Sequence, residues 1–121
     1  MSIVAFLHAA IVVTDLERAS HFYGEVLGLP IVERNLKFAG IWYQAGAVQL
    51  HLIADETIID DLINADKWGR NRHLAFAVAD LEEMKTKLLA QGYPFQLSAS
   101  GRSALFVRDP DGNIIELNQA S

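Results

Sequence analysis

Residues 72–82, RHLAFAVADLE, decide the fold, because residues 7–17, LHAAIVVTDLE, carry the same pattern earlier in the chain. The two stretches align with an offset of 65 positions, which places His8 opposite His73. An internal repeat has to be identified before a fold is assigned, since it means that one structural unit occurs more than once. The sequence therefore predicts two copies of a single unit.

The same offset relates two further polar positions. Leu-His-Leu around His51 aligns with Ile-Glu-Leu around Glu116, again 65 positions later. The Gly-Leu-Pro at 28–30, however, matches the Gly-Tyr-Pro at 92–94 with an offset of only 64. One residue has therefore slipped within the helix or at its exit.

Bulk composition excludes several classes of protein. With 51% hydrophobic residues among 121, the chain can form a folded domain and is not a disordered tail. No apolar stretch approaches the roughly 20 residues needed to cross a bilayer, and the N-terminus lacks the basic start of a signal peptide. The net charge of −5 argues against nucleic acid, and the absence of cysteine excludes thiolate chemistry. We expect a soluble cytoplasmic protein with neither a nucleic-acid nor a membrane partner.

The first half begins with an apolar run over residues 3–13, which predicts a strand covered on both faces. Asp15 is placed to cap the N-terminus of a following helix, and Gly28 is placed to end it. Glycines then separate three short predicted strands, over residues 31–36, 38–44 and 48–54.

The second half repeats this order after an acidic stretch over residues 55–71, which we interpret as a linker. Asp80 caps the predicted helix, whose buried stripe we expect to consist of Leu81, Met84, Leu88 and Leu89. The predicted strands cover residues 73–78, 95–98, 103–107 and 113–118. The result is one α+β domain over 1–121, with βαβββ modules at about 3–54 and 72–119 and mostly antiparallel sheets.

Strand periodicity predicts which way the repeated histidines face. Side chains two positions apart share a face of a strand, so His73 lies with Ala75 and Ala77, while Leu74 and Phe76 point the other way. The bulky face can bury against the helix. The histidine face is lined by small residues, which leaves space above the sheet.

Four ionisable side chains within such apolar strands need a reason, because burying them without partners is costly. A single strand histidine is more often a hydrogen-bonded structural residue than a ligand. Four at matched repeat positions instead favour a metal site built from His8, His51, His73 and Glu116. Imidazole and carboxylate donors suit zinc, nickel, cobalt, iron or manganese better than calcium.

The sequence resembles the vicinal oxygen chelate superfamily, which includes glyoxalase I, bleomycin-resistance and fosfomycin-resistance proteins, methylmalonyl-CoA epimerase and type I extradiol dioxygenases. The resemblance covers essentially the whole chain. It rests on His8 with residues 13–19, residues 22–23 with 26–29, residues 72–76 with Asp80, and residues 106–117.

This resemblance implies paired βαβββ modules whose cupped sheets hold a divalent metal that chelates vicinal oxygens of the substrate. His8, His73 and Glu116 match the three ligands of the dioxygenase and fosfomycin-resistance branches. His51 stands where glyoxalase I has its fourth ligand, there commonly a glutamate. With His51 bound the site would be glyoxalase-like, and without it the remaining triad would suit ferrous oxygen chemistry.

Three functions follow from the resemblance. The favoured one is a metal-dependent glyoxalase-like lyase or isomerase, in which Glu116 is both ligand and catalytic base. The alternatives are an Fe(II)-dependent dioxygenase of the extradiol type and a non-catalytic protein that binds an antibiotic or metabolite. Trp42 and Arg102 are the candidate substrate-binding residues. The resemblance also implies a homodimer, with modules that pair within one chain or are exchanged between two.

Overall fold

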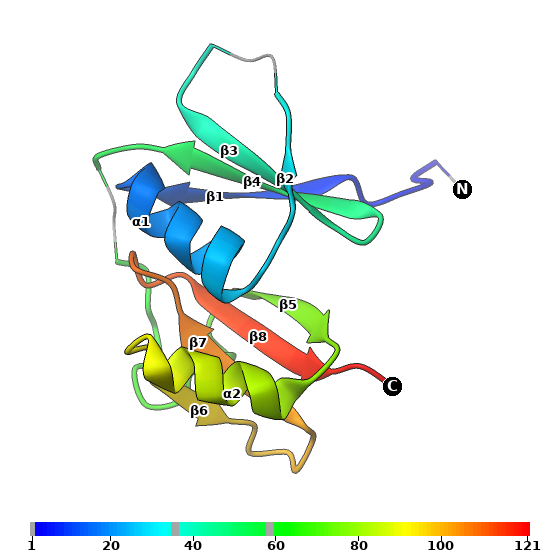
Figure 1. The fold of residues 1–121 in the computed structure, drawn as a ribbon, viewed down its shortest axis with the longest axis vertical. Helices are drawn as coiled ribbons and strands as arrows, with labels where there is room; N and C mark the ends of the chain where they lie inside the picture. The colour runs from blue at the N-terminus through cyan, green and yellow to red at the C-terminus, as the bar shows by residue number, and fades with distance from the viewer. Residues whose placement is uncertain (1, 35–36, 58–59) are drawn as a thin grey trace. The chain divides into compact units, whose positions relative to one another are not determined.

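The structure is a computed structural model that describes residues 2–34, 37–57 and 60–121. The chain divides into two compact units, Met1–Ile58 and Ile59–Ser121. In each unit a helical segment follows the first strand and three further strands complete a four-stranded sheet (Figure 1). The prediction of an α+β fold from two βαβββ modules is thus confirmed.

Unit 1 forms a mixed sheet in the order β1-β4-β3-β2, with β1 parallel to β4 and the other pairs antiparallel. Its elements are β1 (His8–Val13), α1 (Leu16–Ser20), the π-helix η1 (His21–Val26), β2 (Ile31–Val32), β3 (Gly40–Ala45) and β4 (Val48–Ala54).

Unit 2 repeats this topology in the order β5-β8-β7-β6, with β5 parallel to β8. Its elements are the 3-10 helix η2 (Trp68–Arg70), β5 (His73–Val78), α2 (Leu81–Ala90), β6 (Phe95–Leu97), β7 (Ala104–Arg108) and β8 (Ile114–Gln119).

Both predicted helix caps are present. The carboxylate of Asp15 accepts the backbone N–H of Arg18 at 3.1 Å, and that of Asp80 accepts the N–H of Glu83 at 3.1 Å. Each bond satisfies one of the donors that the first turn of a helix leaves free. In both units the helix that follows the first strand therefore begins with the same aspartate cap.

The one-residue slip of the repeat has a structural cause in the first helix. Beyond Ser20 the helix widens into a π-helix, in which the N–H of Leu27 donates to the carbonyl of Phe22, five residues earlier, at 2.8 Å. A π turn holds more residues than an α turn. The first helical segment accordingly takes one residue more between its aspartate cap and its terminal glycine than α2 does.

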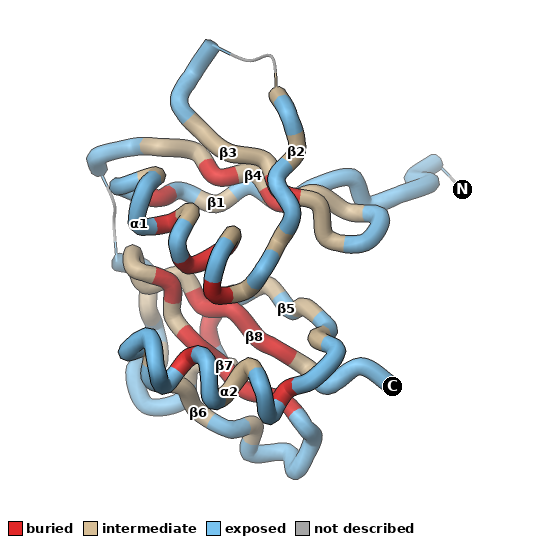
Figure 2. The backbone as a smooth tube through the Cα atoms, viewed as in Figure 1, coloured by how far each residue is buried: buried red, intermediate tan, exposed pale blue. Residues whose placement is uncertain are grey.

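Each unit has a core of its own between its helix and its sheet, shown in red in Figure 2. In unit 1 the fully buried side chains include Phe22, Tyr23, Leu50 and Leu52. In unit 2 they include Leu88, Leu105, Val107, Ile115 and Leu117. The predicted buried stripe of α2 is wrong at Leu89, which is 62% exposed because it lies one position beyond the buried Leu88 and on the outer side of the helix.

The first strand is shorter than predicted. It begins at His8, and the preceding Ile3, Val4, Phe6 and Leu7 are exposed and belong to no strand. The strand that pairs with β1 is β4, which begins only at Val48. Before His8, β4 makes a backbone hydrogen bond to Leu7, from the N–H of Gln49 to the Leu7 carbonyl. The expectation of a strand covered on both faces is also wrong, because β1 alternates between exposed and half-buried residues and only its last residue, Val13, is buried.

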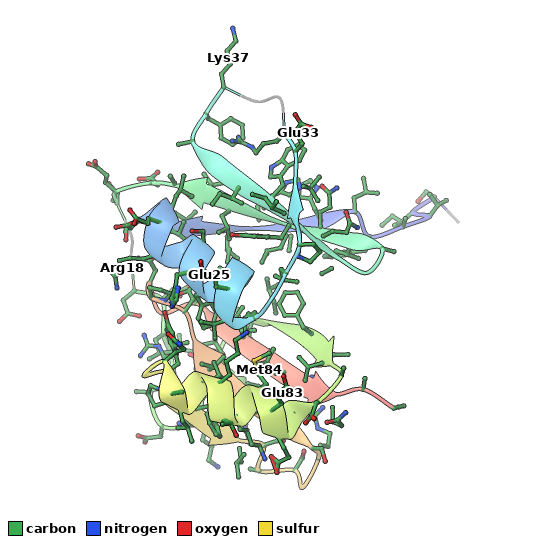
Figure 3. The ribbon with its side chains drawn as sticks, in the orientation of Figure 1. Arg18, Glu25, Glu33, Lys37, Glu83 and Met84 are labelled. Carbon is green, nitrogen blue, oxygen red and sulfur yellow. The ribbon has the colours of Figure 1, made fainter. Side chains whose placement is uncertain are left out.

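The second predicted strand is likewise shortened. Strand β2 covers only Ile31–Val32, and Glu33 and Arg34 have left the sheet. Residues 35–36 of that prediction lie outside the described residues. Farther along the same connection, Lys37 extends away from the strands of unit 1 (Figure 3).

Residues 60–71 make their hydrogen bonds to unit 2. The amide side chain of Gln96 accepts the N–H of Trp68 at 2.9 Å and donates to the carbonyl of Asp66 at 2.9 Å. Asn71 is buried, and its side chain bonds backbone groups of residues 63, 64, 67 and 68. Across the described ranges, no helix is long and apolar enough to span a membrane.

Candidate metal and substrate site

In unit 1 the sheet register brings His8, His51 and Trp42 onto one face. Trp42 of β3 pairs with His51 of β4, and His51 pairs with Ala10 of β1. One step along the same face, Gln49 lies between Gln44 and His8. This face is the one that the small residues of β1 leave open, as strand periodicity predicts.

Three aromatic rings stack in a row across this face. The His51 ring lies between Trp42, at a centroid distance of 4.1 Å and an angle of 8°, and His8, at 4.0 Å and 16°. The guanidinium of Arg34 lies 5.8 Å from the Trp42 ring and 4.8 Å from the Phe38 ring. Stacked rings and a cation over their faces are favourable contacts, so they fix the plane of His51.

Burial lowers the pKa of His51, and the neighbouring His8 and Arg34 lower it further through their positive charge. Its Nε2 lies 2.9 Å from the side-chain oxygen of Gln49. The amide of Gln49 in turn donates to the side-chain oxygen of Gln44 at 3.3 Å. His51 is therefore held as a neutral ring with a hydrogen bond at one of its nitrogens.

These side chains line an open groove of about 620 Å³ in unit 1. Its wall is formed mainly by Phe38, Trp42, Gln44, Gln49, His51 and His8. The guanidinium of Arg34 donates to the carbonyls of Gly40 and Phe38, at 3.0 and 2.7 Å. The groove thus combines apolar surface, two amides and two imidazoles, which are features of a small-molecule site.

In unit 2 the sheet brings His73 and Glu116 together. The Nε2 of His73 lies 3.2 Å from Oε1 of Glu116, with side chains that are 24% and 9% exposed. Phe106 pairs with Glu116 across β7 and β8, and its ring meets the ring of His73 edge to face at 5.4 Å. A nearly buried carboxylate thus faces an imidazole nitrogen beside an aromatic ring.

The tautomer of His73 follows from its other nitrogen. Its Nδ1 lies 2.7 Å from the backbone carbonyl of Asn71, and a carbonyl can only accept. Nδ1 therefore carries a proton, and in the neutral ring Nε2 has only a lone pair. That lone pair faces the Glu116 carboxylate, so a proton or a cation is needed between the two atoms.

A divalent ion fits this pair. Two donor atoms bound to one ion at about 2.0–2.2 Å, at angles of about 90–110°, lie roughly 2.8–3.6 Å apart, a range that includes the observed 3.2 Å. A metal-binding histidine generally donates its other N–H to a carbonyl or carboxylate, as His73 does to Asn71. Both the donor types and the hydrogen bonding behind them suit a transition metal.

The second oxygen of Glu116 is also occupied. Oε2 accepts from the amide of Asn118 at 2.6 Å and lies 3.7 Å from a guanidinium nitrogen of Arg102. Arg102 also donates to the hydroxyl of Ser100 at 2.9 Å and to the oxygen of Asn118 at 3.4 Å. The predicted substrate-binding Arg102 is therefore beside the predicted base, with its side chain still 57% exposed.

The four predicted ligands are brought together in two pairs, His8 with His51 and His73 with Glu116. Within either unit, the described residues include no group of three histidine, aspartate or glutamate side chains that could hold an ion. The complete ligand set remains a prediction.

Sequence reasoning missed two polar neighbours of the histidines. Gln49 and Asn71 each lie two positions before a histidine. A period of two along a strand places such residues on the same face. That spacing could have identified Gln49 as a neighbour of His51, whereas the backbone carbonyl of Asn71 carries no sequence signal.

Comparison with known proteins gives a family match over nearly the whole chain. The sequence model described as Glyoxalase/Bleomycin resistance protein/Dioxygenase superfamily matches residues 5–117. This range includes both pairs of candidate ligands.

Relatives and solved structures agree with that match. The chain is 28% identical to methylmalonyl-CoA epimerase, mitochondrial, of Bos taurus, over 93% of this chain and 73% of that protein. It is 26% identical to a probable lactoylglutathione lyase of Vibrio cholerae, over 98% and 93% of the two chains. A glyoxalase family protein from Bacillus anthracis has the same fold, with a TM-score of 0.78, 24% identity and coverage of 97% and 95%.

Proposed function

We propose, because this chain belongs to the Glyoxalase/Bleomycin resistance protein/Dioxygenase superfamily, that it is a metal-dependent enzyme of the lyase or isomerase type. Its substrate would be a small, oxygen-rich molecule held through adjacent oxygen atoms. The relatives named as lyases and as an epimerase support an enzyme of this general kind.

One observation carries the proposal. The Nε2 lone pair of His73 and Oε1 of Glu116 face each other at 3.2 Å, while Asn71 and Asn118 hold the opposite atoms of both groups. A hydrogen-bonded structural pair would need a proton between them. Two prepared donors at this distance are what a divalent ion requires.

The proposed ligands are His73 and Glu116 as one pair and His8 and His51 as the other, supplied by units of one chain or of two. A zinc, nickel, cobalt, iron or manganese ion would polarise a carbonyl of the bound substrate. Glu116 would take a proton from the carbon beside that carbonyl, with Asn118 orienting its carboxylate. Trp42 would contact the apolar part of the substrate, and Arg102 an anionic group.

The names of the relatives suggest which substrates to test first. Lactoylglutathione and methylmalonyl-CoA are both thioesters with a C–H bond beside the thioester carbonyl. In the proposed function Glu116 would remove the proton of that C–H bond. We propose thioesters or related carbonyl compounds of this kind as substrates, with turnover in the cytoplasm.

Metal analysis tests the proposal. The transition-metal content per chain would be measured by elemental analysis for the wild-type protein and for His51→Ala, both purified without added metal. About one transition-metal ion per chain, bound more weakly by the variant, together with turnover of either thioester, would support the glyoxalase-like enzyme. Iron retained by His51→Ala, with oxygen uptake on a catechol, would replace it with the dioxygenase. No metal after incubation with nickel, zinc, cobalt and iron would indicate a binding protein.

A further inference from the structure

We infer that Gln49, oriented by Gln44, is a positioning residue that holds His51 with its proton on Nε2 and so presents Nδ1 as the free donor. The inference concerns the apoprotein and is drawn from a chain of hydrogen bonds in unit 1. It deepens the proposed function. Only the binding of an ion at Nδ1 rests on that function, because the tautomer itself follows from the hydrogen bonds.

The chain begins at two backbone carbonyls. The side-chain nitrogen of Gln44 donates to the carbonyl of Gly46 at 2.8 Å and approaches that of Val48 at 3.5 Å. Carbonyls accept and never donate, so the nitrogen end of this amide has to face them. The oxygen end of Gln44 is thereby turned toward the neighbouring strand.

Gln49 is the cross-strand partner of Gln44 in the antiparallel pair of β3 and β4. Its side-chain nitrogen donates to the oxygen of Gln44 at 3.3 Å. With the nitrogen used in this way, only the oxygen of Gln49 remains for a second neighbour. The orientation of Gln49 is therefore inherited from the carbonyls that hold Gln44.

That second neighbour is His51, two positions along β4 and on the same face. Its Nε2 lies 2.9 Å from the oxygen of Gln49. Because this oxygen can only accept, Nε2 must carry the hydrogen, and Nδ1 of the neutral ring keeps a lone pair. Stacking between Trp42 and His8 prevents the ring from turning out of this arrangement.

His51 in unit 1 and His73 in unit 2 are consequently set in opposite ways. His73 donates through Nδ1 to Asn71 and turns Nε2 toward Glu116, whereas His51 donates through Nε2 and leaves Nδ1 for a ligand. If His51 binds the proposed ion, Nδ1 can bind without loss of the glutamine hydrogen bond. Binding through Nε2 would break it.

The test is the imidazole nitrogen spectrum of metal-free, 15N-labelled protein at pH 8, recorded through long-range proton–nitrogen correlations. We expect a protonated-type signal for Nε2 and a lone-pair-type signal for Nδ1 in His51. A lone-pair-type Nε2 in His51 of the wild-type protein would overturn the inference.

Substitutions separate positioning from mere structure. Gln49→Lys offers only donors, so the His51 signals should exchange types, whereas Gln49→Glu offers only acceptors and should retain the wild-type pattern. In Gln44→Leu the side-chain amide of Gln49 can rotate by 180°, so both tautomers of His51 should be populated. Adding Gln49→Glu should restore the tautomer with the proton on Nε2. Ala47→Lys places a lysine in the same groove without removing the hydrogen bond and should leave the pattern unchanged. An unchanged pattern in Gln49→Lys would contradict the role of Gln49.

Zinc addition then distinguishes this inference from the proposed function. A change confined to Nδ1 of His51 would support both, and a change at Nε2 would show that the glutamines do not select the donor. If the protein binds none of nickel, zinc, cobalt and iron, the proposed metal-dependent enzyme is excluded. The tautomer of His51 and its response to Gln49→Lys would still decide the inference.

Discussion

At the scale of single residues, His51 gives a pH dependence of stability whose direction can be stated. Burial, with His8 and Arg34, holds its pKa below the ordinary 6.5 in the folded protein. Below about pH 6.5 the unfolded chain therefore binds more protons at this position than the folded chain. The stability contributed by neutral His51 is present above pH 6.5 and is lost as the pH falls toward its lower folded pKa.

The substitution His51→Gln should therefore reduce the loss of stability between pH 7.5 and pH 5.5. The free energy of unfolding in urea, measured at both values for both proteins, gives the comparison. Equal pH dependence in the wild type and His51→Gln would show that this histidine does not titrate as its surroundings indicate.

The Phe106 ring lies so close to the backbone of Gly69 that it leaves no room for a side chain at position 69. A Cβ at this position would lie 2.6 Å from Cζ of Phe106, so Gly69→Ala must displace the ring that meets His73. We expect a loss of about 1–3 kcal/mol in the free energy of unfolding, together with shifted His73 ring signals. Gly24→Ala is the control, because its Cβ would meet Tyr43 at an ordinary 3.5 Å. Unchanged stability in Gly69→Ala would mean that the Phe106 ring moves freely.

Glu116→Gln tests the proposed base. The amide keeps one oxygen, which can remain a weaker donor for a metal, but it cannot take up a proton. Turnover should fall by roughly 10²–10⁴-fold while metal binding remains detectable. Both would be followed in one preparation, by initial rates and by elemental analysis. Wild-type turnover would exclude Glu116 as the base.

The sequence predicted which residues come together in unit 2 better than it predicted their surroundings. The repeat singled out His73 and Glu116, and the structure finds their side chains 3.2 Å apart. It could not show which nitrogen of each histidine is free. That choice depends on a backbone carbonyl for His73 and on two amide orientations for His51, which become visible only in three dimensions.

At the scale of secondary-structure elements, α2 should depend on its aspartate cap. Asp80 accepts the N–H of Glu83, and its loss leaves that donor of the first turn without this partner. Asp80→Ala should lower the free energy of unfolding by about 1 kcal/mol. Asp80→Asn keeps an accepting oxygen and should cost much less. Thermal unfolding of all three proteins, followed by circular dichroism, checks the order, and equal losses in both variants would contradict the cap.

Element boundaries were predicted where a side chain sets them and missed where pairing sets them. Asp15 and Asp80 fixed the helix starts because their carboxylates act locally. The start of β1 depends on where its parallel partner β4 begins, which an apolar run at residues 3–7 does not reveal. The π turn left only an indirect trace in the sequence, as the change of offset from 65 to 64.

At the scale of the whole molecule, the repeat was enough to predict two units of one topology. Each observed sheet places its first strand parallel to its last, with the same order in both units. Residues 60–71 belong to the stretch interpreted as a linker, and the sequence alone could not show that their backbone bonds the side chains of Gln96 and Asn71. Amide side chains make such bonds at many positions, so their partners are not evident from spacing.

Exposed apolar residues before β1 support the predicted homodimer. Ile3, Val4, Phe6 and Leu7 are 66–92% exposed within a short stretch, and concentrated apolar surface of this kind commonly marks an interface. Light scattering should give twice the mass of one chain. The double substitution Val4→Ser with Phe6→Ser should shift the protein toward monomer on dilution, because it removes apolar area from the contact.

Leu89→Ser is the matched control for that experiment, since Leu89 is a similarly exposed apolar residue on the outer side of α2. It should leave the mass unchanged. A wild-type monomer at all concentrations would contradict the dimer. If both variants shift the protein toward monomer equally, the association depends on general surface hydrophobicity. The stretch before β1 would then have no particular part in it.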